Sequence, residues 1–372
     1  MTMIFGIPSA ALFGQLLLGL INGSFYAMLS LGLAVIFGLL NIINFAHGAQ
    51  YMMGAFVAWM LLNYAGIGYW WALFLAPLVV GVFGILLDRN FIKPMNDNNR
   101  VRSAVMAGSA AFFFLLFTYA FTANAGPALV RDTGLNTTVV FALSFFVGVA
   151  TAHLWDRFGT PFTSLEDVHA DHLFGLLLTF GLALILQGLF RNQYGVSGMP
   201  YAIPSQLTGG QQIRLFDTPI MFMPNYRAWV IAASLVVCLV TWFVIEKTKL
   251  GAYLRAATEN PTLVGAFGIN VPLLITLTYG FGVGLAAMAG VLAAPIYSVN
   301  PNMGADLIIV VFAVVVIGGM GSILGSIITG FALGLVEGLT KVFYPEASAT
   351  VIFVIMVMVL LVKPAGLFGR AS

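Results

Sequence analysis

The chain has 372 residues, of which 60% are hydrophobic and only 8% are charged, and its formal net charge is +2. A soluble domain carries roughly 25% charged residues, because its surface must be hydrated. The composition therefore excludes a water-soluble protein and indicates that membrane lipid contacts most of the surface. It gives no indication of a nucleic-acid partner, because the basic residues are spread over several connections and form no patch.

The apolar segments predict membrane-spanning helices. They are about 18–25 residues long, as an α-helix needs to cross the hydrocarbon core, and they lack the alternating pattern of a membrane β-barrel. We predict an all-α polytopic membrane protein with about 10–12 transmembrane helices. The first run, residues 9–43, fits one steeply tilted span or two short spans, and we favour two, because Asn22-Gly23-Ser24 lies near its middle. The other predicted spans are residues 46–63, 70–88, 102–121, 138–155, 170–190, 226–245, 272–297, 306–320, 322–343 and 348–365.

Basic residues predict the orientation, because cytoplasmic loops of membrane proteins carry an excess of Lys and Arg. They gather at residues 89–102, at residues 247–255 and in the C-terminal tail. We therefore expect the C-terminus in the cytoplasm, and we expect three connections outside: 122–137, 191–225 and 298–305. The N-terminus lacks the basic segment of a cleaved signal peptide, so the first hydrophobic segment is expected to be retained.

Residues 246–271 predict a structure other than a flexible linker. They carry charges of both signs and read LGAYLRAA before Pro261, a pattern typical of a short amphipathic helix that ends in a turn. Such a helix can dock in a groove of another protein or lie on lipid headgroups. Both interpretations are open from the residues alone.

Several motifs resemble one family of transport proteins. TKLGAYLRAATENPTLVGAFGINV, at residues 248–271, is similar to the cytoplasmic coupling segment of permeases from ATP-driven importers. INFAHGAQYMMGAF near the start, VVIGGMGSILGSIITGFALGLVEG at residues 315–338 and the ending VKPAGLFGR accompany it in the expected order. The chain therefore resembles the H-type permease subunit of branched-chain amino acid ABC importers, over residues 9–100 and 170–370.

The resemblance implies a function and a set of partners. The chain would move branched-chain or other hydrophobic amino acids across the bacterial inner membrane by alternating access. It would act with a second related permease, two cytoplasmic ABC ATPases and a periplasmic substrate-binding protein. Alternatives are a cargo of urea, a short amide or an aromatic carboxylate in the same machinery, and a passive channel, which is less favoured.

The sequence agrees with this division of labour. It contains no Gly-Lys pair and hence no phosphate-binding loop of the G-x-x-x-x-G-K-[ST] type. ATP hydrolysis is therefore expected in separate chains, and we expect neither enzymatic activity nor a cofactor in this one.

We expect a single permease domain, residues 1–372, with one departure from the family pattern. Residues 101–169 intervene between the two parts of the resemblance and contain two additional apolar stretches. We interpret them as an inserted helical hairpin, which leaves the orientation of all later spans unchanged. Residues 246–271 are treated as the cytoplasmic coupling segment.

Four polar residues within ten positions are candidates for the substrate pathway: Asn41, Asn44, His47 and Gln50. On one continuous helix they would drift around its axis. A break near Phe45-Ala46, with a new helix from His47 or Gly48, would gather them at a helix terminus, which offers unsatisfied backbone groups and a partial charge. Transporters hold substrates at such broken helices. The alternative is a polar cap on a cytoplasmic turn.

The GGMGS motif predicts a second break in the other half of the chain. Its Gly318 and Gly319 are also candidates for the substrate pathway. The two breaks suggest two inverted structural repeats, residues 9–190 and 226–365. Glycine also permits the close approach of helices, and this alternative is favoured for the glycines between residues 325 and 334.

The remaining polar candidates are weighed against structural roles. For contact with the ATPases we assign six residues of the coupling segment: Leu254, Arg255, Ala256, Ala257, Glu259 and Gly268. Glu337 lies in an apolar segment with Lys341 four residues on, so a structural ion pair is favoured over substrate contact. The segment EDVHADH, residues 166–172, is expected to be a solvated loop rather than a metal site. The single cysteine, Cys238, is expected to be a buried hydrophobic residue.

Overall fold

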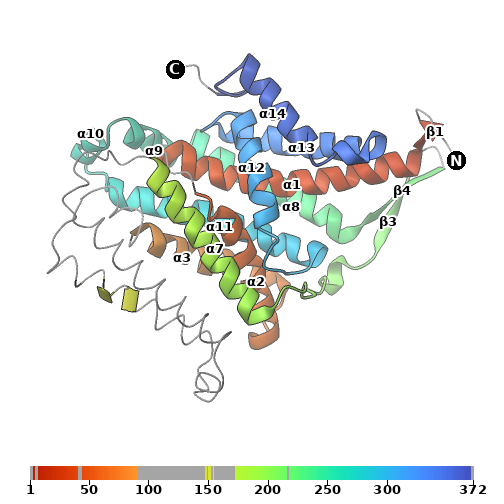
Figure 1. Ribbon diagram of the computed structural model, residues 1–372, viewed down its shortest axis with the longest axis horizontal. Helices are drawn as coiled ribbons and strands as arrows, with labels where there is room; N and C mark the ends of the chain where they lie inside the picture. Colours follow the sequence, from red (N-terminus) through yellow and green to blue (C-terminus); the bar gives the residue numbers. More distant parts are fainter. Residues whose placement is uncertain are drawn as a thin grey trace, which may run out of the picture.

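The computed structural model describes most of the chain outside residues 90–171. The described residues are 3–4, 7–40, 44–89, 147–148, 150–151, 154, 172–215 and 218–369. They form eleven α-helices and two small antiparallel hairpins (Figure 1). The prediction of an all-α polytopic membrane protein is confirmed, because six of these helices are long and apolar enough to cross a membrane.

The helices match most of the predicted spans. The six long ones are α1 (Ser9–Leu40), α3 (Tyr69–Leu87), α7 (His172–Tyr194), α8 (Asn225–Lys247), α11 (Val271–Tyr297) and α13 (Ile323–Phe343). Three further apolar helices are α2 (His47–Ala65), α12 (Ala305–Gly318) and α14 (Val351–Val362). The predicted spans 102–121 and 138–155 lie outside the described residues, apart from isolated positions of the second. The total number of spans and the inserted hairpin therefore stay predictions.

Short elements occupy the connections. The predicted amphipathic segment contains α9 (Lys249–Glu259) and α10 (Pro261–Ala266). The predicted external loop holds a single 3-10 turn, η3 (Ser205–Leu207), and then the hairpin of β3 (Gly210–Leu215) and β4 (Thr218–Pro224). The second hairpin, β1 (Met3–Ile4) and β2 (Ile7–Pro8), precedes α1, and η4 (Pro345–Ala347) follows α13.

The first apolar run forms one helix, so the prediction of two short spans is wrong. Helix α1 has 32 residues, about 48 Å at 1.5 Å per residue, which exceeds a hydrocarbon core of about 30 Å and requires a tilt. Gly23 does not break it. A Cβ at Gly23 would lie 3.0 Å from the Cα of Phe331 and 3.1 Å from the carbonyl oxygen of Gly330. The glycine is there for close packing against α13, which offsets its poor helix propensity.

Helix α11 is the centre of the bundle and packs against α1, α2 and α3. Glycines bring these backbones together: a Cβ at Gly280 would lie 3.0 Å from the Gly81 oxygen, and one at Gly282 would lie 3.0 Å from the Gly32 oxygen. Cys238 is buried in α8, as expected. Figure 1 shows α9 and α10 at the end of α1 opposite the N-terminus and the hairpin β3–β4. The two ends of the molecule therefore carry different short elements.

Candidate functional site

Helix α2 begins in the interior of the bundle, not at its end. Its first residue is His47, as the sequence predicted, and the His47 Nε2 atom lies 3.1 Å from the carbonyl oxygen of Leu29. Leu29 is about 17 Å along α1 from the end of the helix at Leu40. His47 is fully buried. Residues 44–50 therefore lie within the bundle, and both interpretations of the polar segment, as a substrate site and as a cap on a turn, stay predictions.

Three of the four predicted pathway residues form one buried cluster, and Tyr279 of α11 joins it. The Asn44 side-chain amide donates to Gln50 Oε1 at 3.2 Å, and Gln50 also lies beside the side chains of His47 and Tyr279. All four are at most 1% exposed. The fourth predicted residue, Asn41, lies outside the described residues. Sequence reasoning missed Tyr279, because only the packing of α11 against α2 brings it to the cluster.

The cluster has more hydrogen-bonding capacity than the fold uses. Among the described residues, Asn44 Oδ1 has no hydrogen-bond partner, and His47 Nδ1, Gln50 Nε2 and the Tyr279 hydroxyl form no well-aligned hydrogen bond, although Gln50 lies against both His47 and Tyr279. A buried polar group left without a partner costs about 1–3 kcal/mol. A cluster that carries this cost in the middle of an apolar bundle is a candidate for binding a polar ligand.

The first turns of α2 and α12 meet beside this cluster. A Cβ at Gly48 would overlap the backbone of Gly304, the residue that precedes α12. Neither helix has a side-chain cap at its N-terminus, where the cap positions are Ala46 and Gly304. Helix N-termini present free N–H groups and a partial positive charge. The first amides here are already bonded, since Ala305 and Asp306 donate to the Asn302 carbonyl oxygen and His47 donates to that of Asn44, so it is the partial positive charge of the two helix ends that favours a carboxylate.

Gly318 and Gly319 lie elsewhere, so the structure does not bring them together with the polar cluster. Gly319 ends α12 with φ of 100°, a conformation that favours glycine. The turn binds the C-terminal segment: the amides of Leu367 and Phe368 donate to the carbonyl oxygens of Ile317 and Gly318 at 2.8 and 3.1 Å. The connection that does reach the cluster is residues 298–304, which the sequence predicted as an external loop.

The predicted coupling residues divide between two faces of α9. Leu254 and Ala257 are 2% and 4% exposed and anchor the helix to the bundle. Ala256 and Glu259 are exposed. Arg255 donates to the carbonyl oxygen of Ile245 at 3.0 Å and reaches Glu246 at 3.5 Å. The sixth residue, Gly268, follows α10 with φ of 80°. Only part of the predicted set can therefore touch another protein directly.

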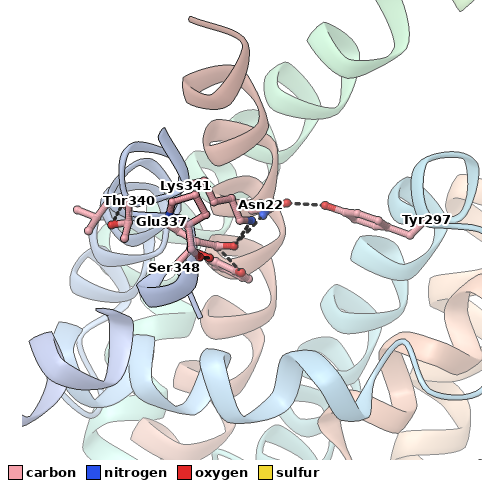
Figure 2. Close-up of polar contacts among 9 residues, drawn as sticks. Asn22, Tyr297, Glu337, Thr340, Lys341 and Ser348 are labelled. Carbon is pink, nitrogen blue, oxygen red and sulfur yellow. Dashed lines mark hydrogen bonds and ion pairs between the residues drawn. The ribbon is translucent and has the colours of Figure 1, made fainter. Parts of the chain in front are cut away.

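The predicted ion pair between Glu337 and Lys341 is confirmed. Glu337 also accepts hydrogen bonds from the Tyr26 hydroxyl at 2.7 Å and from the Asn22 amide at 3.4 Å, and Tyr297 donates to Asn22 (Figure 2). The network joins α13, α1 and the last residue of α11. Because every charge in it is paired, its arrangement is that of an interhelical link.

A metal site has no support in the described part of the chain. No group of three or more His, Cys, Asp or Glu side chains that could hold a metal ion occurs there. The segment EDVHADH lies outside the described residues, except for His172, at which α7 begins.

Comparison with known proteins decides the family. The family model for the permease component of branched-chain amino acid transport systems matches residues 15–362. The chain belongs to this permease family. It is 26% identical to the high-affinity branched-chain amino acid transport system permease protein LivH of Salmonella typhimurium and equally to LivH of Escherichia coli strain K12, over 96% of this chain and 95% of each relative. It is 27% identical to BraD of Pseudomonas aeruginosa with the same coverage. No solved structure matches.

Family membership settles the class of protein. The relatives are named as permeases, which are transport subunits and not enzymes. Together with the apolar helices, this makes the chain a multi-pass membrane protein of branched-chain amino acid transport.

The permease also carries an acidic residue, Asp306, that sequence reasoning did not single out. Asp306 lies in the first turn of α12 and is exposed in the single chain. A helix dipole stabilises an acid there by about 0.3–1 kcal/mol, whereas an Asp at the centre of a membrane helix costs about 2.5–3.5 kcal/mol. The dipole alone does not account for this residue. Gly304, two residues before Asp306, meets Gly48 at the start of α2.

Proposed function

We propose that this permease is the membrane subunit of an ABC importer that moves branched-chain or other hydrophobic amino acids into the cell by alternating access. It acts in the bacterial inner membrane with a second related permease, two cytoplasmic ATPases and a periplasmic binding protein. The observation that carries the proposal is the exposed face of α9 and α10. A channel would need no such helix pair on one end of its bundle.

The contacts of α9 with the rest of the bundle can transmit a movement of α9 to the membrane helices. Leu254 belongs to the main apolar core and Ala257 packs with Val264 and Val271. Arg255 ties α9 to the end of α8 through Ile245. A displacement of the exposed face by an ATPase is therefore passed to α8 and to the start of α11, which leads to the polar cluster. We assign the direct contact to Ala256 and Glu259, and the anchoring to the buried residues.

The orientation follows from the basic residues around this end of the bundle. Lys247 and Lys249 flank the start of α9, and Lys363 follows α14. Lys and Arg near the ends of membrane spans favour the cytoplasmic side. We therefore place α9, α10 and the C-terminus in the cytoplasm and the hairpin β3–β4 outside.

The polar cluster is the proposed place where the substrate passes. A zwitterionic amino acid offers a carboxylate to the N-termini of α2 and α12 and to the amide of Gln50. The cluster is buried, so passage requires that α2, α11 or α12 move, which alternating access supplies. Asn44, His47 and Gln50 contact the substrate in this proposal. The roles of Asn41, Gly318 and Gly319 in the pathway have no further support.

The test is transport by the complete complex. The chain is co-expressed with the ATPases, second permease and binding protein encoded beside it, and ATP-dependent uptake of labelled L-leucine into proteoliposomes is measured. We expect Ala256→Arg to abolish co-purification of the ATPases and uptake, because the exposed face no longer fits. Glu346→Arg is the matched control, since Glu346 is exposed in η4 after α13 and should leave both unchanged.

Two results would contradict the proposal. One is uptake of L-leucine that continues without ATP, which would indicate a channel. The other is wild-type ATPase binding and uptake in Ala256→Arg. Uptake of urea, a short amide or an aromatic carboxylate in place of L-leucine would keep the machinery and replace the cargo.

A further inference from the structure

We propose that Arg191, Asn302 and Asp306 form a recognition site for a free amino acid zwitterion on the approach to the polar cluster. Arg191 binds the carboxylate, Asp306 binds the ammonium group, and Asn302 positions Arg191. The inference rests on the proposed function, because it assigns the residues that select the substrate of that transport.

The three residues are held together by the connection between α11 and α12. Asn302 Oδ1 accepts hydrogen bonds from Gln187 at 2.8 Å and from Arg191 at 3.2 Å, both on α7. The backbone oxygen of Asn302 accepts from the Asp306 amide at 3.3 Å. Asn302 therefore holds the Arg191 side chain of α7 beside the connection that enters α12, four residues before Asp306.

Residues 298–304, which connect α11 to α12, are held in place by backbone hydrogen bonds, so the site exists before a ligand binds. Val299 pairs with Met199 through two backbone hydrogen bonds of 2.8 Å. Ser298 has φ of 57°, in a region that residues other than glycine adopt only when their surroundings impose it. These contacts hold residues 298–304 against the loop that contains Met199. The connection then leads into the start of α12 in the interior of the bundle.

The charges are available to a ligand. In the described part of the chain, neither Arg191 nor Asp306 forms an ion pair with the other or with any other residue. Both are exposed in the single chain. Charged side chains in membrane-spanning segments face a partner or an aqueous cavity and mark substrate pathways. An unpaired cation on α7 and an unpaired anion on α12, both near Asn302 in the chain or in contact with it, match a solute whose ammonium and carboxylate groups are attached to the same carbon atom.

Apolar side chains line the same two helices on the way inward. Phe45, just before α2, packs between Phe180 of α7 and Phe312 of α12, with ring centroids at 6.4 and 6.0 Å. Ile309, one turn beyond Asp306, is 59% exposed. Ile309 offers apolar surface to the side chain of an amino acid bound at Asp306, whereas the aromatic stack lies further inward, since Phe180 is about 16 Å along α7 from Arg191. A strongly polar side chain would gain nothing from this surface.

The test uses the complete reconstituted transporter with L-leucine as the probe. We expect Arg191→Gln and Asp306→Asn each to lower the uptake rate at least 10-fold, and Asp306→Glu to retain uptake within threefold of wild type, because it keeps the charge. The melting temperature of each variant should equal that of wild type. Arg214→Gln, on the exposed face of β3, and Glu346→Gln are matched controls that should transport normally.

Three outcomes separate this inference from the proposed function. Uptake within twofold of wild type in both neutral variants overturns the inference alone. A loss of uptake that comes with an equal loss of thermal stability and is not restored in Asp306→Glu also overturns it, because the residues would then be structural. Failure of the wild-type complex to take up L-leucine with ATP overturns the proposed function, and the inference with it.

Discussion

Glu337 has three side-chain partners in the interior of the bundle. Its side chain is 11% exposed, forms an ion pair with Lys341, and accepts hydrogen bonds from the side chains of Tyr26 and Asn22. A buried carboxylate is tolerated in a membrane span only with such partners. The i,i+4 spacing was sufficient to predict Lys341 as a partner. The spacing could not show Tyr26 and Asn22, because they come from a helix more than 300 residues away in the sequence.

We expect Glu337→Gln to lower the free energy of unfolding by about 1–2 kcal/mol, through the loss of charge-assisted hydrogen bonds. The cost stays moderate because the Lys341 side chain is 35% exposed, so its ammonium group can turn toward the lipid headgroups. Thermal melting of the purified protein measures the change. A double-mutant cycle with Lys341→Met should give a coupling energy of about 1 kcal/mol. Additive effects of the two substitutions would show that the pair contributes nothing.

At the scale of elements, the sequence predicted where helices lie better than how they meet. The start of α2 at His47 and the helix within LGAYLRAA follow from polar breaks and periodicity, which are local. The single helix α1 was missed, because Asn22-Gly23-Ser24 has the composition of a turn. In the structure Gly23 lies against the backbone of Gly330 and Phe331 in α13, a contact that the local sequence does not show. The same limit applies to Gly304, which meets Gly48 only in three dimensions.

Glycines on α1 allow a matched test of this packing. A Cβ at Gly19 would overlap the carbonyl oxygen of Gly334 in α13, whereas a Cβ at Gly14 would meet nothing within 4 Å. We expect Gly19→Ala to cost about 1–3 kcal/mol, the usual effect of overpacking. Gly14→Ala should be neutral or stabilise by up to about 1 kcal/mol, because alanine is the better helix former. Melting temperatures measure both, and equal values would show that α1 and α13 do not depend on close contact.

At the scale of the whole molecule, the two ends of the bundle are chemically different. One carries α9, α10 and the motif VKPAGLFGR bound to GGMGS, and the other carries the hairpin β3–β4. The family motifs therefore mark both the proposed coupling surface and the turn that fixes the C-terminal segment. The sequence showed these motifs without their contacts, so it could not show that the turn at Gly318 and Gly319 binds the C-terminal segment, and their place in the substrate pathway stays a prediction. The two inverted repeats stay a prediction.

The orientation of these two ends relative to the membrane can be tested by thiol labelling, because the native thiol of Cys238 is not expected to react. Cys238 is the only cysteine in the chain and is 0% exposed, so an impermeant maleimide should not react with the wild-type protein. Gln212→Cys places an exposed thiol on β3 and Thr258→Cys places one on α9. We expect the first to be labelled in intact cells and the second only after the inner membrane is opened, since Lys and Arg near α9 favour the cytoplasm. The reverse pattern would place α9 outside, where no ATPase could reach it, and would contradict the coupling role together with the orientation.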